Sequence, residues 1–114
     1  MLPEFRTATH PGQILLAEFL EPLRLTQAEL ARALQVPLNR VNELVRGKRG
    51  ITPESAFLLS AYFGNSPEFW MNLQTAHDLS RTRQEMRNGM RKRPGGIARI
   101  RKPAKARRRA QGAD

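Results

Sequence analysis

The chain has 114 residues, enough for one compact domain and a tail but not for two full domains. It contains no cysteine, which excludes disulfide bonds and thiolate metal sites, and it has no run of about 18 apolar residues that would span a membrane. Its first residues lack the basic and apolar regions of a signal peptide, so we expect a cytoplasmic protein. We also expect it to use no cofactor and no metal.

The formal net charge of +10 is concentrated at one end of the sequence. Residues 1–80 carry seven basic and eight acidic side chains, whereas residues 81–114 carry thirteen basic and two acidic ones, a net charge of +11. Within the first part, four of the seven cations fall between Arg40 and Arg49. A basic cluster on a body that is otherwise close to neutral indicates a docking face for a polyanion.

Helical signals fill the first 84 residues, where strand alternation is absent. They predict five helices, at residues 11–21, 27–34, 38–46, 53–63 and 67–78. Pro22 is expected to end the first helix, and a reciprocal capping box of Thr26 and Glu29 is expected to start the second. Gly47 and Gly64 suit the left-handed positions that terminate the third and fourth helices. The predicted fold is therefore an all-α domain of short helices.

The last two helices are expected to start in the same way. Thr52 precedes Pro53, and Ser66 precedes Pro67, so each helix has a hydroxyl cap followed by proline at its first position. The last helix is expected to fade after Asp78 into a charged stretch.

A compositional change marks the final part of the chain. From about Asn88 onward, prolines and glycines interrupt a run of arginine and lysine that contains few apolar residues. Such a segment cannot bury enough surface to offset its conformational entropy and is predicted to be disordered. We therefore divide the chain into a helical domain, residues 1–84, and a basic tail, residues 85–114. The tail is either a solvated end or a non-specific nucleic-acid arm, and its excess of cations favours the arm.

The second and third predicted helices have the spacing of a helix-turn-helix. Ala31 supplies the small residue that lets two helices cross closely, and Val36 supplies an apolar residue in the turn. Val41 and Leu44 are the apolar anchors of the second helix of the pair, ten and thirteen residues after Ala31. Any three-helix bundle has small residues at its crossings, but the basic cluster that follows favours DNA binding over a purely structural role.

This arrangement leaves one side of the predicted recognition helix, residues 38–46, free to enter a major groove. Arginine can bridge guanine, asparagine can bridge adenine, and glutamate can accept from cytosine. The following basic corner suits phosphates, as does a side chain at the start of the preceding helix. The expected DNA contacts are Gln27, Leu38, Asn39, Arg40, Asn42, Glu43, Arg46, Lys48 and Arg49.

Three segments in order resemble a known family, the HigA-type antitoxins, also described as VapI-like. These segments are H-P-G-Q-I-L-L-A-E-F-L-E-P-L at residues 10–23, V-P-L-N-R-V-N-E-L-V-R-G-K-R-G-I-T at residues 36–52 and Y-F-G-N-S-P-E-F-W-M-N-L-Q at residues 62–74. The resemblance implies a lambda-repressor-like, Xre-type DNA-binding fold and a place in a type II toxin–antitoxin pair. It also implies a homodimer that binds a HigB toxin, which is a RelE-like ribosome-dependent mRNA endonuclease, and represses its own operon.

Two positions depart from the usual helix-turn-helix pattern. Gln35 stands where many such turns have glycine, and a positive φ there would cost about 1 kcal/mol. Pro37 replaces the common Ser or Thr cap of the recognition helix, which would leave one N–H free for phosphate. Neither departure removes the fold. The basic tail is not part of the shared pattern.

Two further surfaces are assigned from the sequence. The stripe of Phe69, Trp70, Leu73 and His77 is either plain core or, in its exposed part, a two-fold dimer seam. A RelE-like toxin is expected to be basic because it handles RNA, so acidic side chains are expected to face it. The expected toxin-binding residues are Glu4, Glu18, Glu21 and Glu29.

Competing functions remain open. One alternative is a free-standing Xre-type transcriptional regulator without a toxin partner. Another is a general nucleic-acid-associating protein that binds through its tail. An enzyme is the weakest interpretation, because Ser60 and Ser66 lack a plausible base and His77 lacks a second ligand at metal spacing.

Overall fold

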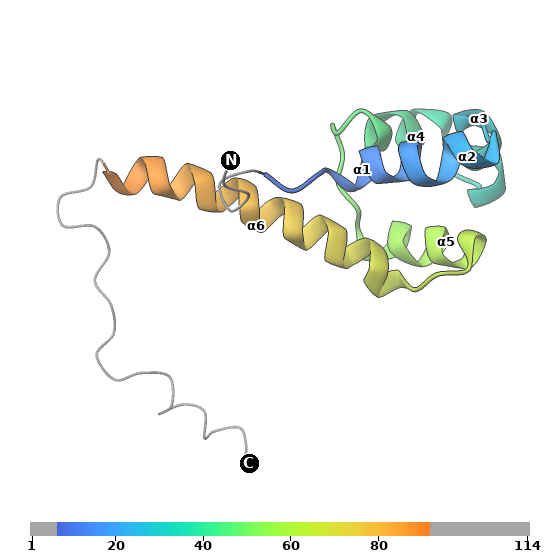
Figure 1. Ribbon diagram of the computed structural model, residues 1–114. Helices are drawn as coiled ribbons and strands as arrows, with labels where there is room; N and C mark the ends of the chain where they lie inside the picture. The colour runs from blue at the N-terminus through green and yellow to red at the C-terminus, as the bar shows by residue number, and fades with distance from the viewer. Residues whose placement is uncertain (1–6, 92–114) are drawn as a thin grey trace, which may run out of the picture. The chain divides into compact units, whose positions relative to one another are not determined.

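The computed structural model describes residues 7–91, and within that range the chain forms five helices and no strand (Figure 1). The first helix is continuous over residues 11–23 and comprises α1 (Pro11–Ile14), η2 (Leu15–Leu20) and α2 (Glu21–Leu23). The others are α3 (Gln27–Leu34), α4 (Leu38–Val45), α5 (Pro53–Phe63) and α6 (Pro67–Arg91). The predicted all-α class is confirmed. None of these helices combines the length and apolar character needed to cross a membrane.

The first helix does not end at Pro22, so that prediction was wrong. Proline has no N–H to donate to the carbonyl of Glu18, and its ring crowds that carbonyl. The helix accommodates the ring by widening over η2, where π-helical hydrogen bonding extends to the Glu21 N–H, which donates to the Leu16 carbonyl. The chain then leaves the helix at Arg24, whose φ of 56° is left-handed.

The predicted helix starts are confirmed. The Thr26 hydroxyl accepts from the Glu29 N–H at 3.0 Å, and the Glu29 carboxylate accepts from the Thr26 N–H at 2.9 Å. Thr52 caps α5 by accepting from the Ser55 N–H at 3.2 Å, and Ser66 accepts at 3.0 Å from the N–H three residues on. Because capping depends only on residues three apart, these helix starts can be predicted from the sequence.

The last helix, α6, is longer than predicted. It continues to Arg91 instead of fading after Asp78. The added stretch lacks an apolar period but is rich in arginine, glutamine, glutamate and methionine, which are good helix formers. Residues 85–91, assigned to the tail, are therefore helical. The predicted disorder beyond residue 91 falls outside the described residues, and the domain boundary at residue 84 stays a prediction.

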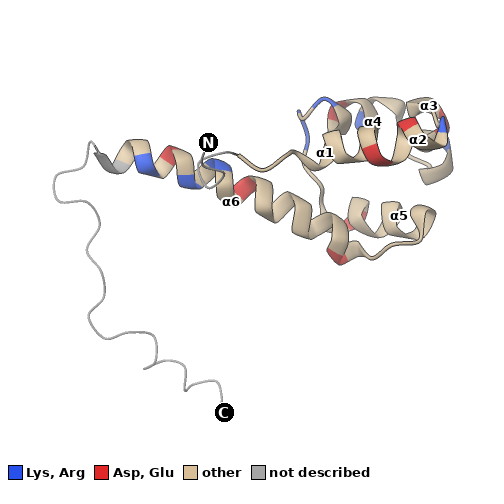
Figure 2. Ribbon diagram, viewed as in Figure 1, with Lys and Arg blue, Asp and Glu red and all other residues tan. Residues whose placement is uncertain are grey.

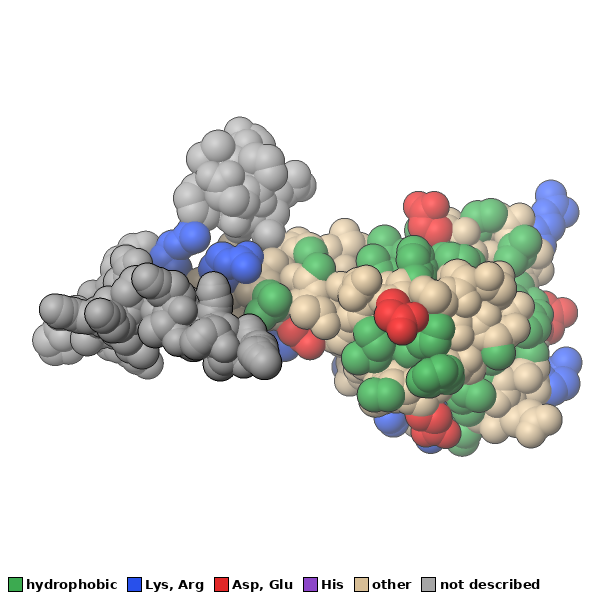
Figure 3. Space-filling model, turned by 90° about the horizontal axis from the view of Figure 1, so that it is seen from below, with side chains coloured by type: hydrophobic (Ala, Val, Ile, Leu, Met, Phe, Trp, Pro, Cys, Tyr) green, Lys and Arg blue, Asp and Glu red, His purple; other side chains and the backbone are tan. Residues whose placement is uncertain are grey.

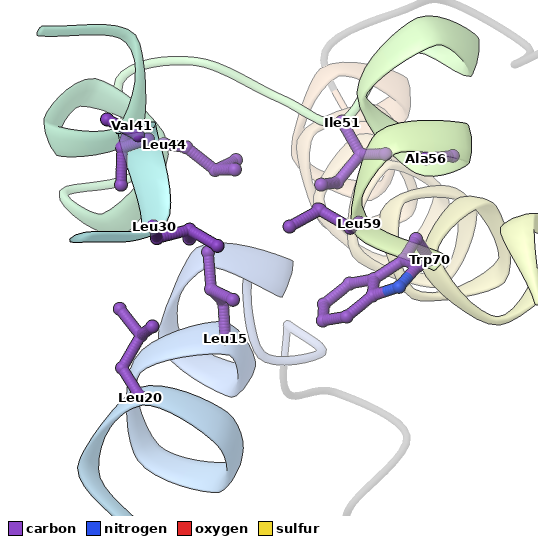
Figure 4. Packing of buried hydrophobic residues seen from close by; sticks show 10 residues of the cluster. Leu15, Leu20, Leu30, Val41, Leu44, Ile51, Ala56, Leu59 and Trp70 are labelled. Carbon is purple, nitrogen blue, oxygen red and sulfur yellow. The ribbon is translucent and has the colours of Figure 1, made fainter. Parts of the chain in front are cut away.

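One hydrophobic core joins all five helices (Figure 4). Its buried apolar residues are Leu15, Leu20, Leu30, Ala31, Val41, Leu44, Ile51, Ala56, Leu59 and Trp70. The Trp70 indole packs on Phe19 with ring centroids 5.0 Å apart and donates to the Asn65 side-chain oxygen at 2.9 Å. Trp70 is completely buried, so the interpretation of this residue as core is correct and its place in a dimer seam was wrong.

The segment before the first helix lies along α6. The Ala8 N–H donates to the Ser80 hydroxyl at 2.7 Å, and His77 donates to the Ala8 carbonyl at 2.7 Å. The rings of His10 and His77 meet edge to face at 4.9 Å, so His77 is a half-buried internal contact instead of the expected surface or dimer residue. His10 also caps the first helix, because its Nδ1 accepts from the Gly12 N–H at 2.8 Å. Burial, and then the nearby His77, lower the pKa of His10.

The start of the first helix passes directly under the end of α4. A Cβ atom added to Gly12 would overlap the backbone carbonyl of Leu44. This carbonyl belongs to the helix backbone and cannot rotate away as a side chain can. Only glycine therefore permits the approach, and the contact fixes the position of the C-terminal end of α4.

Replacing Gly12 tests this close approach. We expect Gly12→Ala to lower the free energy of unfolding by about 1–3 kcal/mol, because the added methyl forces the two backbones apart. Urea unfolding followed by circular dichroism measures the change. Gly89→Ala is the matched control: it makes the same substitution inside α6, where an added Cβ would meet nothing within 4 Å beyond the helix's own backbone, and should be neutral or slightly stabilising. Equal stability of the Gly12→Ala variant and the unaltered chain would contradict the contact.

Candidate nucleic-acid interface

The helices α3 and α4 cross as the sequence predicts. Ala31, Val41 and Leu44 are all buried, and Val36 packs against the core from the turn. The Val36 N–H donates to the Ala31 carbonyl at 3.0 Å, which closes the end of α3. With these inward residues fixed, the opposite side of α4 remains exposed.

The two residues that depart from the usual turn pattern, Gln35 and Pro37, have left-handed and extended backbone conformations, respectively. Gln35 has a φ of 59°, so the chain accepts the strain of a left-handed non-glycine residue, which costs about 1 kcal/mol. Pro37 occupies the cap position of α4 and provides no side-chain hydrogen bond to the helix start. The corner after α4 ends the helix at Gly47, whose φ of 77° confirms the predicted left-handed glycine.

One row of polar side chains links the start of α3 to the exposed side of α4. The Asn42 amide donates to the Gln27 side-chain oxygen at 3.2 Å, a bond between the two helices. The Arg46 guanidinium donates to the Asn42 oxygen at 3.4 Å. Three of the expected DNA contacts are thus brought together, and each restrains the rotamer of its neighbour.

A second row runs beside the first. Arg49 donates to one Glu43 carboxylate oxygen from Nε at 3.1 Å and from a terminal nitrogen at 2.8 Å, and Asn39 donates to the other oxygen at 3.3 Å. The hydrogen bond from Arg49 lowers the pKa of Glu43. Glu43 is therefore ionised at neutral pH, and its contacts hold Arg49 from the basic corner against the exposed side of α4.

The remaining expected contacts are distributed around these rows. Leu38 is 50% exposed and lines a shallow groove together with Gln27, Asn39 and Asn42. The exposed Lys48 lies in the loop that follows α4, where Figure 2 shows basic residues. Arg40 lies on the flank of α4 nearest α5 and approaches Glu54 to 4.0 Å. Its place differs from that of the other expected readers, because it faces a second helix.

Gln74 was missed by the sequence reasoning. Its side-chain oxygen accepts from the Ile51 N–H at 2.6 Å, and its side-chain nitrogen donates to Asp78 at 2.9 Å. It thereby anchors the end of the basic corner to α6, and a Cβ on Gly50 would come within 2.9 Å of the same Gln74 oxygen. No local pattern signals this contact, because its partners are 23 residues apart.

The acidic residues expected to face a toxin have different surroundings. Glu18 and Glu21 are exposed on the first helix. Glu29 is exposed too, but its carboxylate serves the capping box of α3. Glu4 falls outside the described residues. In the described part of the chain, no group of three or more His, Cys, Asp or Glu side chains is arranged to hold a metal ion.

A helix pair of this geometry, with amides and cations on the outer side of its second helix, is the DNA-binding unit of the helix-turn-helix proteins. A helix-turn-helix family model matches residues 16–70. The chain belongs to the HigA-type, VapI-like antitoxin family within that class.

Three relatives illustrate this membership. The chain is 47% identical to virulence-associated protein I of Dichelobacter nodosus over 68% of this chain and 72% of that protein. It is 46% identical to antitoxin HigA-1 of Vibrio cholerae over 63% of this chain and 68% of that one. The solved structure of Pseudomonas aeruginosa antitoxin HigA with the higBA promoter matches 80% of this chain and 99% of that chain, with 37% identity and a TM-score of 0.72.

Two substitutions separate base reading from phosphate binding. We expect Asn39→Ala to weaken binding to a specific duplex by about 1–3 kcal/mol and to relax preference at one base position. Lys48→Ala should weaken binding to all duplexes alike and reduce the salt dependence, log K against log salt, by about 1. Titrations of a duplex selected from random sequence and of its scrambled version measure both effects. Equal losses of the Asn39→Ala variant on both duplexes would make Asn39 a phosphate contact.

Proposed function

We propose that this protein is an antitoxin that binds operator DNA through α4, represses its own operon and neutralises a HigB-like, RelE-type mRNA endonuclease. The observation that carries the DNA-binding part is the pair of hydrogen-bonded rows on the exposed side of α4, through Asn42 and through Glu43. Such side chains are held in place before DNA arrives, so binding immobilises little that was free. The similarity to a HigA solved with its promoter supports the same use of this face.

The toxin part of the proposal is tested by rescue of growth. The reading frame beside this gene should encode a short basic protein that arrests growth when expressed, and co-expression of this chain should restore growth. We expect the double variant Glu18→Arg, Glu21→Arg to lose rescue, because two acids proposed to face a basic toxin become basic. The variant should still fold and bind the operator, because both side chains are exposed. Glu85→Arg, the same change at an exposed acid of α6, is the control and should rescue. An adjacent frame without a toxin would instead favour a free-standing regulator.

Operator binding requires a symmetric pair of chains. The eight-residue helix α4 covers only a few base pairs, and two half-sites lie about 34 Å apart on DNA when two-fold related helices read them.

The surface that we propose for a second copy is an apolar face of α5, where Phe57 is 65% exposed, Tyr62 is 45% exposed and Ala61 is exposed (Figure 3). Phe69 adjoins this set through the aromatic cluster around Phe63, whereas Leu73 is half-buried in α6.

A charge placed on this face tests the dimer. We expect Phe57→Glu to shift the chain from dimer to monomer in sedimentation at tens of micromolar, because a carboxylate would be buried without a partner. Operator affinity should fall with dimerisation while the helical signal in circular dichroism is retained. Leu79→Glu, at another exposed hydrophobic residue, is the control and should leave the dimer intact. A Phe57→Glu variant that still dimerises would return the seam to Phe69 and its neighbours.

We further propose that the basic tail adds affinity without sequence preference. Residues 85–114 carry eleven basic and two acidic side chains, a net charge of +9, and phosphate binding by such a segment releases counterions. The same charge would be repelled by a basic toxin, which favours the acidic side chains of the first helix as the toxin-binding surface.

A further inference from the structure

A cavity of about 130 Å³ lies between the recognition helix and α5. Its floor is apolar and buried, formed by Leu30 from α3, Val41 and Leu44 from α4, and Leu59 from α5. In Figure 4, Leu30 and Leu44 face Leu59 across this part of the core. Leu34 completes the wall on the side of α3. The cavity is thus built from the same residues that hold α4 in place.

The size and lining of the cavity suit one small apolar group. An engineered cavity of about 150 Å³ with similar aliphatic walls stays dry and binds benzene. The leucine and valine floor offers no hydrogen-bond partner to a water molecule, whereas Thr52 and Ser55 line the outer part of the cavity. A ring or a short branched chain would therefore gain apolar contacts at the floor.

The rim of the cavity is charged. Arg40, Arg49 and Glu54 line it, so its formal charge is positive. Arg49 is held by Glu43 at 2.8 Å, whereas Arg40 and Glu54 approach only to 4.0 Å, the outer limit of an ion pair. A carboxylate beside the cavity would accept two parallel hydrogen bonds from the Arg40 guanidinium, a stronger arrangement than its present pair.

We propose that this cavity is an effector site for a small organic acid with an apolar body of about the size of a ring. The body fills the space beneath α4, and the carboxylate binds Arg40 at the rim. Arg40 already lines the cavity, and a bound carboxylate holds its guanidinium there, where it cannot contact DNA. The acid therefore lowers operator affinity, and by linkage the operator lowers affinity for the acid. The regulatory half of this inference rests on the proposed operator binding, whereas the binding half does not.

Benzoate is the probe for the binding half, titrated into the full chain without DNA and followed by two-dimensional NMR. We expect saturable shifts at Leu34, Leu58 and Leu59 with a dissociation constant on the order of 1 mM. Acetate tests the charge alone, benzyl alcohol the ring alone and benzylamine the opposite charge. Each should bind at least about tenfold more weakly than benzoate. Shifts with acetate equal to those with benzoate, or tighter binding of benzylamine, would overturn the proposal.

Variants on two walls connect the site to these shifts. Arg40→Gln should weaken benzoate binding about tenfold or more, because the charge-assisted hydrogen bonds are lost. Leu34→Phe should fill the cavity and abolish binding, and Leu58→Phe does so from the opposite side if the first variant packs poorly. Unchanged benzoate binding in both filled variants, with thermal unfolding still cooperative, would place the acid elsewhere and overturn the site.

The regulatory half is measured separately, by operator titration with and without saturating benzoate. Operator affinity of the unaltered chain should fall, and that of the Leu34→Phe variant should not respond. A chain that binds benzoate but no operator would refute the proposed function and leave the cavity site standing. A chain that binds operator and ignores benzoate would refute only the cavity site.

Discussion

Helix α4 is anchored to the core from its inner side. Val41 and Leu44 anchor it to the core, and the glycine backbone at Gly12 supports its last turn. A helix of eight residues is too short to be stable alone in water, so these contacts supply its stability. These inner contacts leave the outer side of α4 exposed, where polar and charged residues lie together with Leu38, which is 50% exposed.

The outer side is nevertheless ordered, through bonds among the functional residues themselves. Asn42 joins the two helices through Gln27, and Glu43 joins the helix to the basic corner through Arg49. Charge alone disfavours an acidic residue on a surface proposed to bind DNA. Glu43 offsets this repulsion by holding Arg49 in place, so that Arg49 would lose less side-chain entropy on binding a phosphate. The interface is thus arranged within the protein before any DNA is bound.

The sequence predicted features set by near neighbours and missed those set by distant ones. The capping box at Thr26 and the left-handed Gly47 depend on residues a few positions away, and both were found. Pro22 was misread because a helix can accommodate a proline by widening, as this one does over η2, and the helix then ends at Arg24, two residues after the proline. Likewise, the nine expected DNA contacts follow from local helix and loop patterns, whereas the hydrogen bond between Gln74 and the Ile51 N–H joins residues 23 apart, and no local pattern contains it.

Helix α5 contributes to three features of the domain: the cavity, the surroundings of Arg40 and the exposed apolar surface. Its inner residue Leu59 borders the cavity beneath α4, its acidic Glu54 lies 4.0 Å from Arg40 of α4, and its outer residue Phe57 is 65% exposed. A small movement of α5 would therefore change the cavity, the position of Arg40 and the dimer surface together. In the proposed two-fold dimer, the surface around Phe57 would set the distance between the two α4 helices, and DNA tolerates little change in that distance. A ligand that fills the cavity would then affect the proposed operator binding in two ways, through the charge of Arg40 and through the spacing of the two α4 helices.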